Sequence, residues 1–193
     1  MDTATFPADD TVISLTQAWV AEAVIGLNLC PFAKSVYVKQ QIRYVVSHAD
    51  NEADLAQQLL NELQHLQAAD PELLDTTLLI HPHVLQDFYD YNNFLDVADQ
   101  VLEDVELDGV IQIASFHPQY QFADALPDDI DNYTNRSPFP ILHLLRESSI
   151  DRAVAAYPEA SAIFERNIAT MRDLGLKGWN RLAFVVSKKQ HQL

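Results

Sequence analysis

Histidines follow two apolar segments of the chain, at the point where each segment reaches a proline. Thr77–Ile80 is followed by His81–His83 (HPH), and Gly109–Ser115 is followed by Phe116–Pro118 (FHP). Both apolar segments are predicted to be β-strands. If these strands are parallel neighbours, their carboxyl ends share one edge of the sheet, which is where open α/β sheets bind ligands. The sequence therefore predicts a histidine-lined pocket at that edge.

Three of these histidines could hold a divalent metal. His81 and His83 are two residues apart, so an extended backbone points both imidazoles to the same side. His117 would supply a third ligand from the other strand, and neutral imidazoles suit zinc, iron or manganese. Without a metal, His117 could act as a catalytic acid or base. The alternative is that histidines at strand ends bond backbone groups or face solvent.

A second group of polar residues precedes a helix that the sequence predicts over Pro138–Glu147. Thr134, Asn135 and Ser137 could bind the start of this helix, where free N–H groups attract anions. Arg136 is the first Lys or Arg after Arg43. Its guanidinium beside that helix start would hold a carboxylate or phosphate with two hydrogen bonds. A small anionic molecule is therefore the expected partner.

The same predicted helix carries His143, Arg146 and Glu147 at positions i, i+3 and i+4, which share one face. Glu147 could orient the His143 imidazole for proton transfer, or the two could form a helical metal pair. Arg146 would add to the anion site. The alternative is an ordinary polar pair on a solvated face.

The single cysteine, Cys30, is followed by Pro31. If Pro31 begins a short helix, Cys30 becomes its N-cap, and the helix field together with Lys34 would favour the thiolate. As a nucleophile Cys30 would need a base such as His143 or His117. The alternative is a small buried hydrophobic residue.

The elements that must position these residues alternate in type. Predicted strands at 42–47, 77–81 and 109–115 are separated by helices that begin at Asn51 and near Asn92. This β-α-β-α-β order favours an α/β fold with three layers and a mostly parallel sheet. We further expect an N-terminal helix from Thr11, C-terminal helices and a last strand at an edge, over 182–186. The chain is expected to be a single domain over 1–193, with a loose arm at 1–10, a long loop at 115–138 and a frayed tail at 188–193.

The composition limits the classes of partner that the protein is expected to bind. The net charge is −16, with 48% hydrophobic and 21% charged residues, and no Lys or Arg occurs between Tyr44 and Asn135. Such a surface repels nucleic acids and anionic membranes. There is no apolar run long enough to cross a bilayer and no signal-peptide pattern, and one cysteine cannot form an internal disulfide. The expected location is the cytoplasm, and the oligomeric state stays open.

Three motifs together resemble a bacterial family known only as a domain of unknown function. They are GLNLCPFAK at 26–34, FHP at 116–118 and TNRSPFPILHLLRE at 134–147. The resemblance covers nearly the whole chain and implies a bacterial cytosolic protein of about this length. It carries no reaction, cofactor or catalytic residue.

Three functional hypotheses follow from these residues. The first is a small-molecule enzyme that uses the histidines and Arg136 for hydrolysis or metal-assisted proton transfer. The second is a non-catalytic acidic module that binds a basic partner. The third is a thiol or redox protein centred on Cys30.

Overall fold

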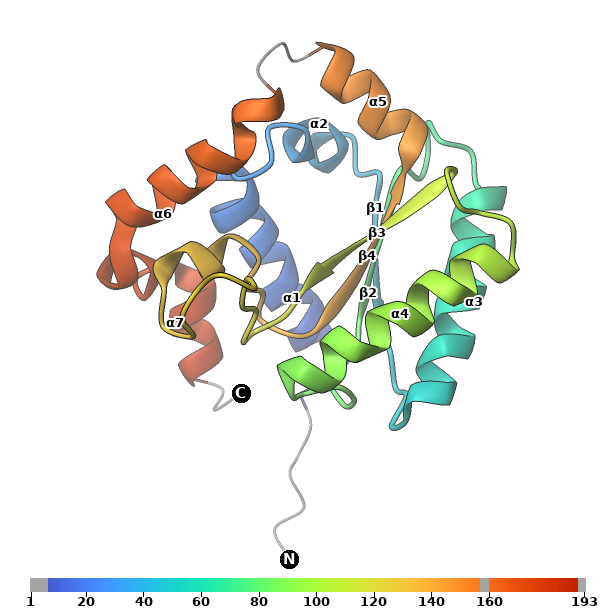
Figure 1. Ribbon diagram of the computed structural model, residues 1–193, viewed down its shortest axis with the longest axis horizontal. Coiled ribbons are helices and arrows are strands. Elements are labelled where there is room, and N and C mark those ends of the chain that lie inside the picture. The colour runs from blue at the N-terminus through green and yellow to red at the C-terminus, as the bar shows by residue number, and fades with distance from the viewer. Residues whose placement is uncertain (1–6, 157–159, 191–193) are drawn as a thin grey trace, which may run out of the picture.

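A four-stranded sheet lies between two layers of helices in the computed structural model, which describes residues 7–156 and 160–190 (Figure 1). The order across the sheet is β1, β2, β4, β3. The strands span Ile42–Val46 (β1), Thr76–Ile80 (β2), Ile111–Phe116 (β3) and Ile141–Arg146 (β4).

The α/β class and the β-α-β-α-β order are confirmed, with α3 (Glu52–Ala68) between β1 and β2, and α4 (Phe88–Asp104) between β2 and β3. The expected mostly parallel sheet is wrong. Only β1 and β2 are parallel, because β4 lies between β2 and β3 and runs antiparallel to both. The ends of β2 and β3 still share one edge of the sheet, but they are not neighbours.

The strand β4 replaces the helix that was predicted over 138–147. Phe139 precedes Pro140, and a residue before proline is disfavoured in the helical region. The remaining short apolar run, Ile141–Arg146, has a pattern that periodicity alone cannot assign to a helix or a strand. Its position in the middle of the sheet decides the outcome, because both faces of β4 are covered and most of its residues are buried.

Each face of the sheet packs against its own helices (Figure 1). On one face α3 and α4 bury Leu59, Leu63, Phe94 and Leu142. Asn51 caps α3 by accepting a hydrogen bond from the Asp54 N–H at 2.9 Å. The other face packs against α1 (Asp9–Trp19), the π-helix η1 (Val20–Ile25), α6 (Ile163–Trp179) and α7 (Ala183–Gln190).

The last strand expected at 182–186 is instead part of α7. The Glu22 carboxylate accepts hydrogen bonds from the backbone N–H groups of Ala183 and Phe184, at 2.7 and 3.3 Å. A carboxylate at these positions satisfies the free donors at the start of a helix. Glu22 of η1 is distant in sequence from α7, so no local sequence pattern predicts this contact.

Two further α-helices, α2 (Ala33–Val38) and α5 (Glu147–Ala156), lie over one end of the sheet (Figure 1). The helix α5 follows β4 directly. The short 3-10 helices are η2 (Ile130–Thr134) and η3 (Ala160–Ala162). The expected arm at 1–10 and tail at 188–193 lie partly outside the described residues, while Asp9 begins α1 and Gln190 ends α7. Within the described part, no helix has both the length and the apolar character to span a membrane.

Candidate functional site

The histidines at the ends of β2 and β3 gather around one buried aromatic ring. The Tyr91 ring lies 5.7 Å from the His81 ring and 5.0 Å from the His117 ring, centroid to centroid. Tyr91 comes from α4, and its hydroxyl donates to the Ile141 carbonyl at the start of β4. His81 and His117 thus lie close together at one edge of the sheet, as predicted. The strand β4 lies between their two strands, and the Tyr91 ring lies between the two imidazoles.

Both imidazoles are fully buried, and their nitrogens bond mainly to backbone. His81 Nδ1 donates to the Val84 carbonyl at 3.1 Å, and His117 Nε2 donates to the Leu85 carbonyl at 3.2 Å. His117 Nδ1 accepts from the Gln119 N–H at 3.0 Å. Burial lowers the pKa of each histidine to about 4, so both are neutral near pH 7. They hold the loop after β2, in which Leu85 has a φ of 58°.

These contacts do not form the predicted metal site. His117 uses both ring nitrogens in hydrogen bonds, and His83 stacks on His48 with the ring centroids 5.9 Å apart. Within residues 7–156 and 160–190, no three His, Cys, Asp or Glu side chains are grouped so that they could hold a metal ion. The arrangement supports the alternative given for strand-end histidines, in which they bond backbone groups.

Arg136 stabilises the loop between β3 and β4. Its guanidinium donates to the carbonyls of Tyr120 and Pro127, at 3.3 and 2.6 Å, and its Cζ lies 4.1 Å from the centroid of the Tyr133 ring. No helix begins at Pro138, so the N–H groups expected to complete an anion site are absent from this place. The neighbouring polar side chains also bond locally: Asn135 to Ser115 O, Thr134 to Asp131 O and Ser137 to Phe139 O.

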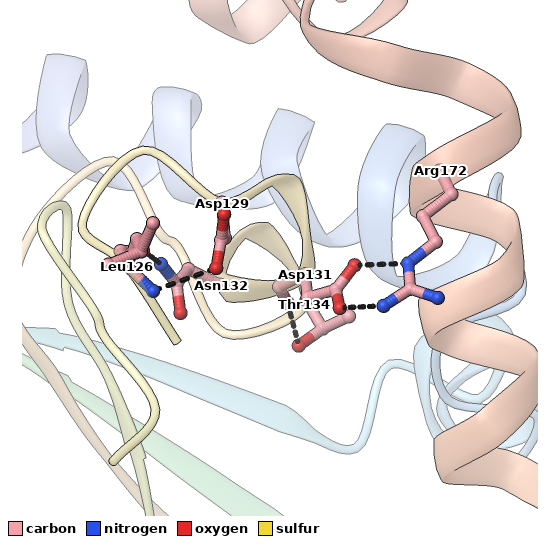
Figure 2. A network of polar contacts seen from close by, with 6 residues as sticks. All are labelled: Leu126, Asp129, Asp131, Asn132, Thr134 and Arg172. Carbon is pink, nitrogen blue, oxygen red and sulfur yellow. Dashed lines mark hydrogen bonds and ion pairs between the residues drawn. The ribbon is translucent and has the colours of Figure 1, made fainter. Parts of the chain in front are cut away.

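The same loop has polar contacts within itself and an ion pair to α6 (Figure 2). Asn132 is fully buried, and its amide donates to the Leu126 carbonyl at 2.7 Å. Asp131 forms an ion pair with Arg172 of α6 at 2.6 Å. The long loop is therefore an ordered part of the fold, and sequence analysis gave no role to Asn132, the buried amide at its centre.

Arg146 and Glu147 do not share a helical face with His143. Successive side chains of a strand point to opposite faces, so Arg146 leaves β4 on the α3 side. There it donates to the carbonyls of Leu66 and Ala69 at the end of α3, at 2.5 and 2.8 Å, and to Leu74 O. Glu147 begins α5, and its N–H bonds the Val110 carbonyl. The predicted i, i+4 pair of His143 and Glu147 is wrong because 141–146 is a strand.

A cavity lies on the opposite face of the sheet, beneath α2 and α5. Its volume is about 630 Å³, within the range of about 300–1,000 Å³ that is usual for small-molecule sites, and its walls are mainly apolar. The floor is formed by the sheet, and the roof by η1, the segment around Cys30 and α2. We call it the α2–α5 cavity. Its lining includes Trp19, Val24, Cys30, Val36, Ile42, Thr76, Leu78, Ala114, Phe116, His143, Leu145, Ser149, Ile150, Arg152, Ala153 and Ala156.

His143 lies on the floor of the α2–α5 cavity, in the middle of β4 between Leu78 of β2 and Ala114 of β3. Its Nε2 lies 2.7 Å from Thr76 Oγ1. The Thr76 hydroxyl donates its single hydrogen to the Leu144 carbonyl at 2.6 Å, so it must accept one from His143. Nε2 therefore carries the proton, and Nδ1 is the nitrogen with the free lone pair. Burial lowers the pKa of His143 to about 4.

Cys30 shares the α2–α5 cavity with His143, although the two are far apart in sequence. The helix α2 begins at Ala33 and not at Pro31. Burial raises the pKa of the Cys30 thiol, while hydrogen bonds from the backbone N–H groups of Phe32 and Ala33 act in the opposite direction. The expectation that a helix field favours the Cys30 thiolate is wrong, because desolvation by burial raises the pKa more than the two backbone hydrogen bonds lower it. The thiol is protonated near pH 7.

Of the predicted candidates, the fold therefore brings Cys30 and His143 into one cavity and leaves Arg136 and the strand-end histidines elsewhere. Thr76 was missed, since nothing in the sequence near Thr76 indicates a partner in β4.

Comparisons with known proteins agree with the motifs. The chain matches no curated protein and no solved structure at a significant level. A family model described as "Protein of unknown function (DUF1415)" matches residues 11–181, which contain all three motifs and every residue that lines the cavity. The chain therefore belongs to the DUF1415 family, as the resemblance of its motifs indicated.

Proposed function

We propose that the protein is an enzyme that acts on a small, mainly apolar molecule in the α2–α5 cavity, with His143 as the proton acceptor. The observation that carries this proposal is the free lone pair of His143 Nδ1, held by Thr76 on the floor of a cavity large enough for a substrate. A fixed tautomer is what general-base catalysis requires of an imidazole.

Cys30 supplies a nucleophile in the same cavity. In the proposed reaction the thiol proton moves to His143 Nδ1, directly or through one water, while sulfur attacks the carbonyl carbon of an ester. The alcohol leaves with the proton from His143, and a thioester remains on Cys30. Water then adds to the thioester with His143 again accepting a proton, and the acid is released as the thiol re-forms. The N–H groups of Phe32 and Ala33 stabilise the sulfur while it is negatively charged.

Both groups are neutral near pH 7. His143 stays unprotonated at any pH well above about 4, so its lone pair is available near pH 7. The raised pKa of the thiol means that Cys30 depends on a base, and no stable thiolate forms without one. This dependence separates the proposal from a redox sensor, which needs a low-pKa, accessible thiol.

The test is hydrolysis of p-nitrophenyl butyrate, an activated ester with a short apolar chain. Cys30→Ala and His143→Gln should each lower kcat/KM about a hundred-fold or more, because each removes a group that takes part in bond making or proton transfer. His65→Gln is the matched control, since His65 is exposed on α3 and away from the cavity. Hydrolysis that survives both substitutions would overturn the assignment. Ligand binding with no turnover of any ester would make the protein a binding protein.

A further inference from the structure

We propose that residues 31–40, which contain α2, form a lid that opens to admit the substrate to the α2–α5 cavity and closes over it. We call this segment the lid. In the structure the lid is closed, since Ala33, Ser35 and Val36 line the cavity. This inference rests on the proposed function, because it concerns access to the same site.

The helix α2 has little apolar packing of its own. It is six residues long and has no buried residue. Val36 faces the cavity, whereas Tyr37 and Val38 are exposed. A helix this short depends on the packing of an apolar face for its stability. A molecule bound in the cavity therefore supplies a large share of the surface on which α2 can pack.

The lid also has few polar contacts with other elements. Among the residues that the structure describes, its backbone–backbone hydrogen bonds stay within residues 30–41. The start of α2 has no side-chain cap. Within the same described part of the chain, no hydrogen bond or ion pair involves the polar side chains of α2, which are Lys34, Ser35 and Tyr37. Displacing the lid therefore breaks few interactions with the rest of the fold.

Both ends of the lid are attached to the fold. Before it, the Cys30 N–H donates to the Val24 carbonyl of η1 at 3.2 Å, and the Leu29 carbonyl accepts from the Asn167 amide of α6 at 2.8 Å. After it, Gln41 is buried, and its side-chain amide donates to two carbonyls in the turn before β2. The segment between these attachments can thus move while its ends stay in place.

The residue before the second attachment suits the role of a hinge. Gln40 has a φ of 58°, in the left-handed region where a residue with a side chain is strained. Rotation at Gln40 to a negative φ would release this strain as the lid opens. The motion also reaches the nucleophile, because the N–H groups of Phe32 and Ala33 bond the Cys30 sulfur and belong to the lid. Closure over a substrate therefore also completes the surroundings of Cys30.

Hydrogen–deuterium exchange of the full chain tests the lid, with 1-(4-nitrophenyl)pentan-2-one as the ligand. This ketone has a methylene group in place of the ester oxygen of p-nitrophenyl butyrate, so it cannot be hydrolysed. Without ligand, the amides of α2 should exchange at least about ten-fold faster than those of α3, which has five buried residues. Ligand at saturation, established by calorimetry, should slow exchange in α2 at least about three-fold and leave α3 unchanged.

A pair of valine variants tests the contact between the lid and the ligand. Val36 lines the cavity, whereas Val38 is exposed and does not line it, so Val38→Ser is the matched control for Val36→Ser. Val36→Ser should remove most of the slowing that the ligand causes in α2. Val38→Ser should retain that slowing, and an equal effect of the two substitutions would contradict closure over the ligand.

The other outcomes are equally decisive. Exchange in α2 as slow as in α3 without ligand would show that α2 is a fixed roof and would overturn the lid. Exchange in α2 that saturating ligand leaves unchanged would do the same, as would absence of binding by the ketone. The ester assay decides the proposed function separately, because hydrolysis that survives His143→Gln overturns that function and leaves the exchange result as it is.

Discussion

At the scale of single residues, the hydroxyl of Thr76 determines which nitrogen of His143 can accept a proton. Thr76→Val keeps the shape of the side chain and removes the acceptor of the Nε2 proton. We expect both tautomers of His143 to become populated and kcat for ester hydrolysis to fall about ten-fold with little change in KM. Nitrogen-15 NMR of the imidazole measures the tautomers directly. A single, unchanged tautomer in Thr76→Val would show that Thr76 does not position His143.

The buried histidines also predict how stability depends on pH. His81, His117 and His143 each have a folded-state pKa of about 4, below the unfolded value near 6.5. Between these two values the unfolded chain binds more protons than the folded chain. The contribution of these histidines to the free energy of unfolding is therefore complete above pH 6.5 and is lost as the pH is lowered toward 4. For fully buried His81, a shift of this size corresponds to about 3 kcal/mol.

Urea unfolding measured from pH 4 to pH 8 checks this expectation. His117→Gln should lessen the loss of stability in acid, because one of the three groups no longer titrates. His65→Gln, an exposed substitution on α3, should leave the pH dependence as it is in the unmodified protein. Equal slopes for all three proteins would contradict the assignment of a depressed pKa to His117.

At the scale of elements, Arg146 joins the central strand to the end of α3. Its buried side chain donates to the carbonyl of Leu66 in the last turn of α3 and to that of Ala69, the residue that follows the helix. Arg146→Met should lower the free energy of unfolding by about 2–4 kcal/mol, since buried carbonyls lose a charged donor. Chemical denaturation measures this loss, with exposed Arg181→Met as the control. A loss as small as that of the control would show that the contacts contribute little.

The elements also show where sequence reasoning worked and where it failed. The strands β1 to β3 and helices α3 and α4 were predictable, because alternating or continuous apolar runs and the cap Asn51 are local signals. The expected start of α4 near Asn92 was wrong, since α4 begins at Phe88 and is capped by Asp87. The strand β4 was not, since a short run of Ile, Leu and His fits a helix equally well until its neighbours in the sheet are known. For α7 the cap comes from Glu22 in η1.

At the scale of the whole molecule, the candidate site depends on this one misassigned strand. Cys30 and His143 were both singled out in the sequence, and they line one cavity because β4 lies between β2 and β3. No sequence pattern indicated the cavity, because its walls come from elements that are far apart in the chain: η1, α2, α5 and the sheet. Conversely, His81 and His117 lie close together as predicted, but they bond to backbone carbonyls of the loop after β2. These contacts hold the loop and do not form a metal site.

The charge of the molecule is also unevenly distributed in space. The helices α3 and α4 belong to the segment without Lys or Arg and cover one face of the sheet, while the α2–α5 cavity opens on the other face.

The most direct test of the central claim fills the α2–α5 cavity without touching its reactive groups. Ala153 faces the cavity from α5, whereas the adjacent Val154 is exposed and does not line it. The measurement is kcat/KM for hydrolysis of p-nitrophenyl butyrate by Ala153→Trp and Val154→Trp. We predict that Ala153→Trp loses at least about nine-tenths of the activity, because the indole occupies the substrate's volume, and that Val154→Trp retains it. Equal activity in the two folded variants would contradict the claim that the reaction takes place in this cavity.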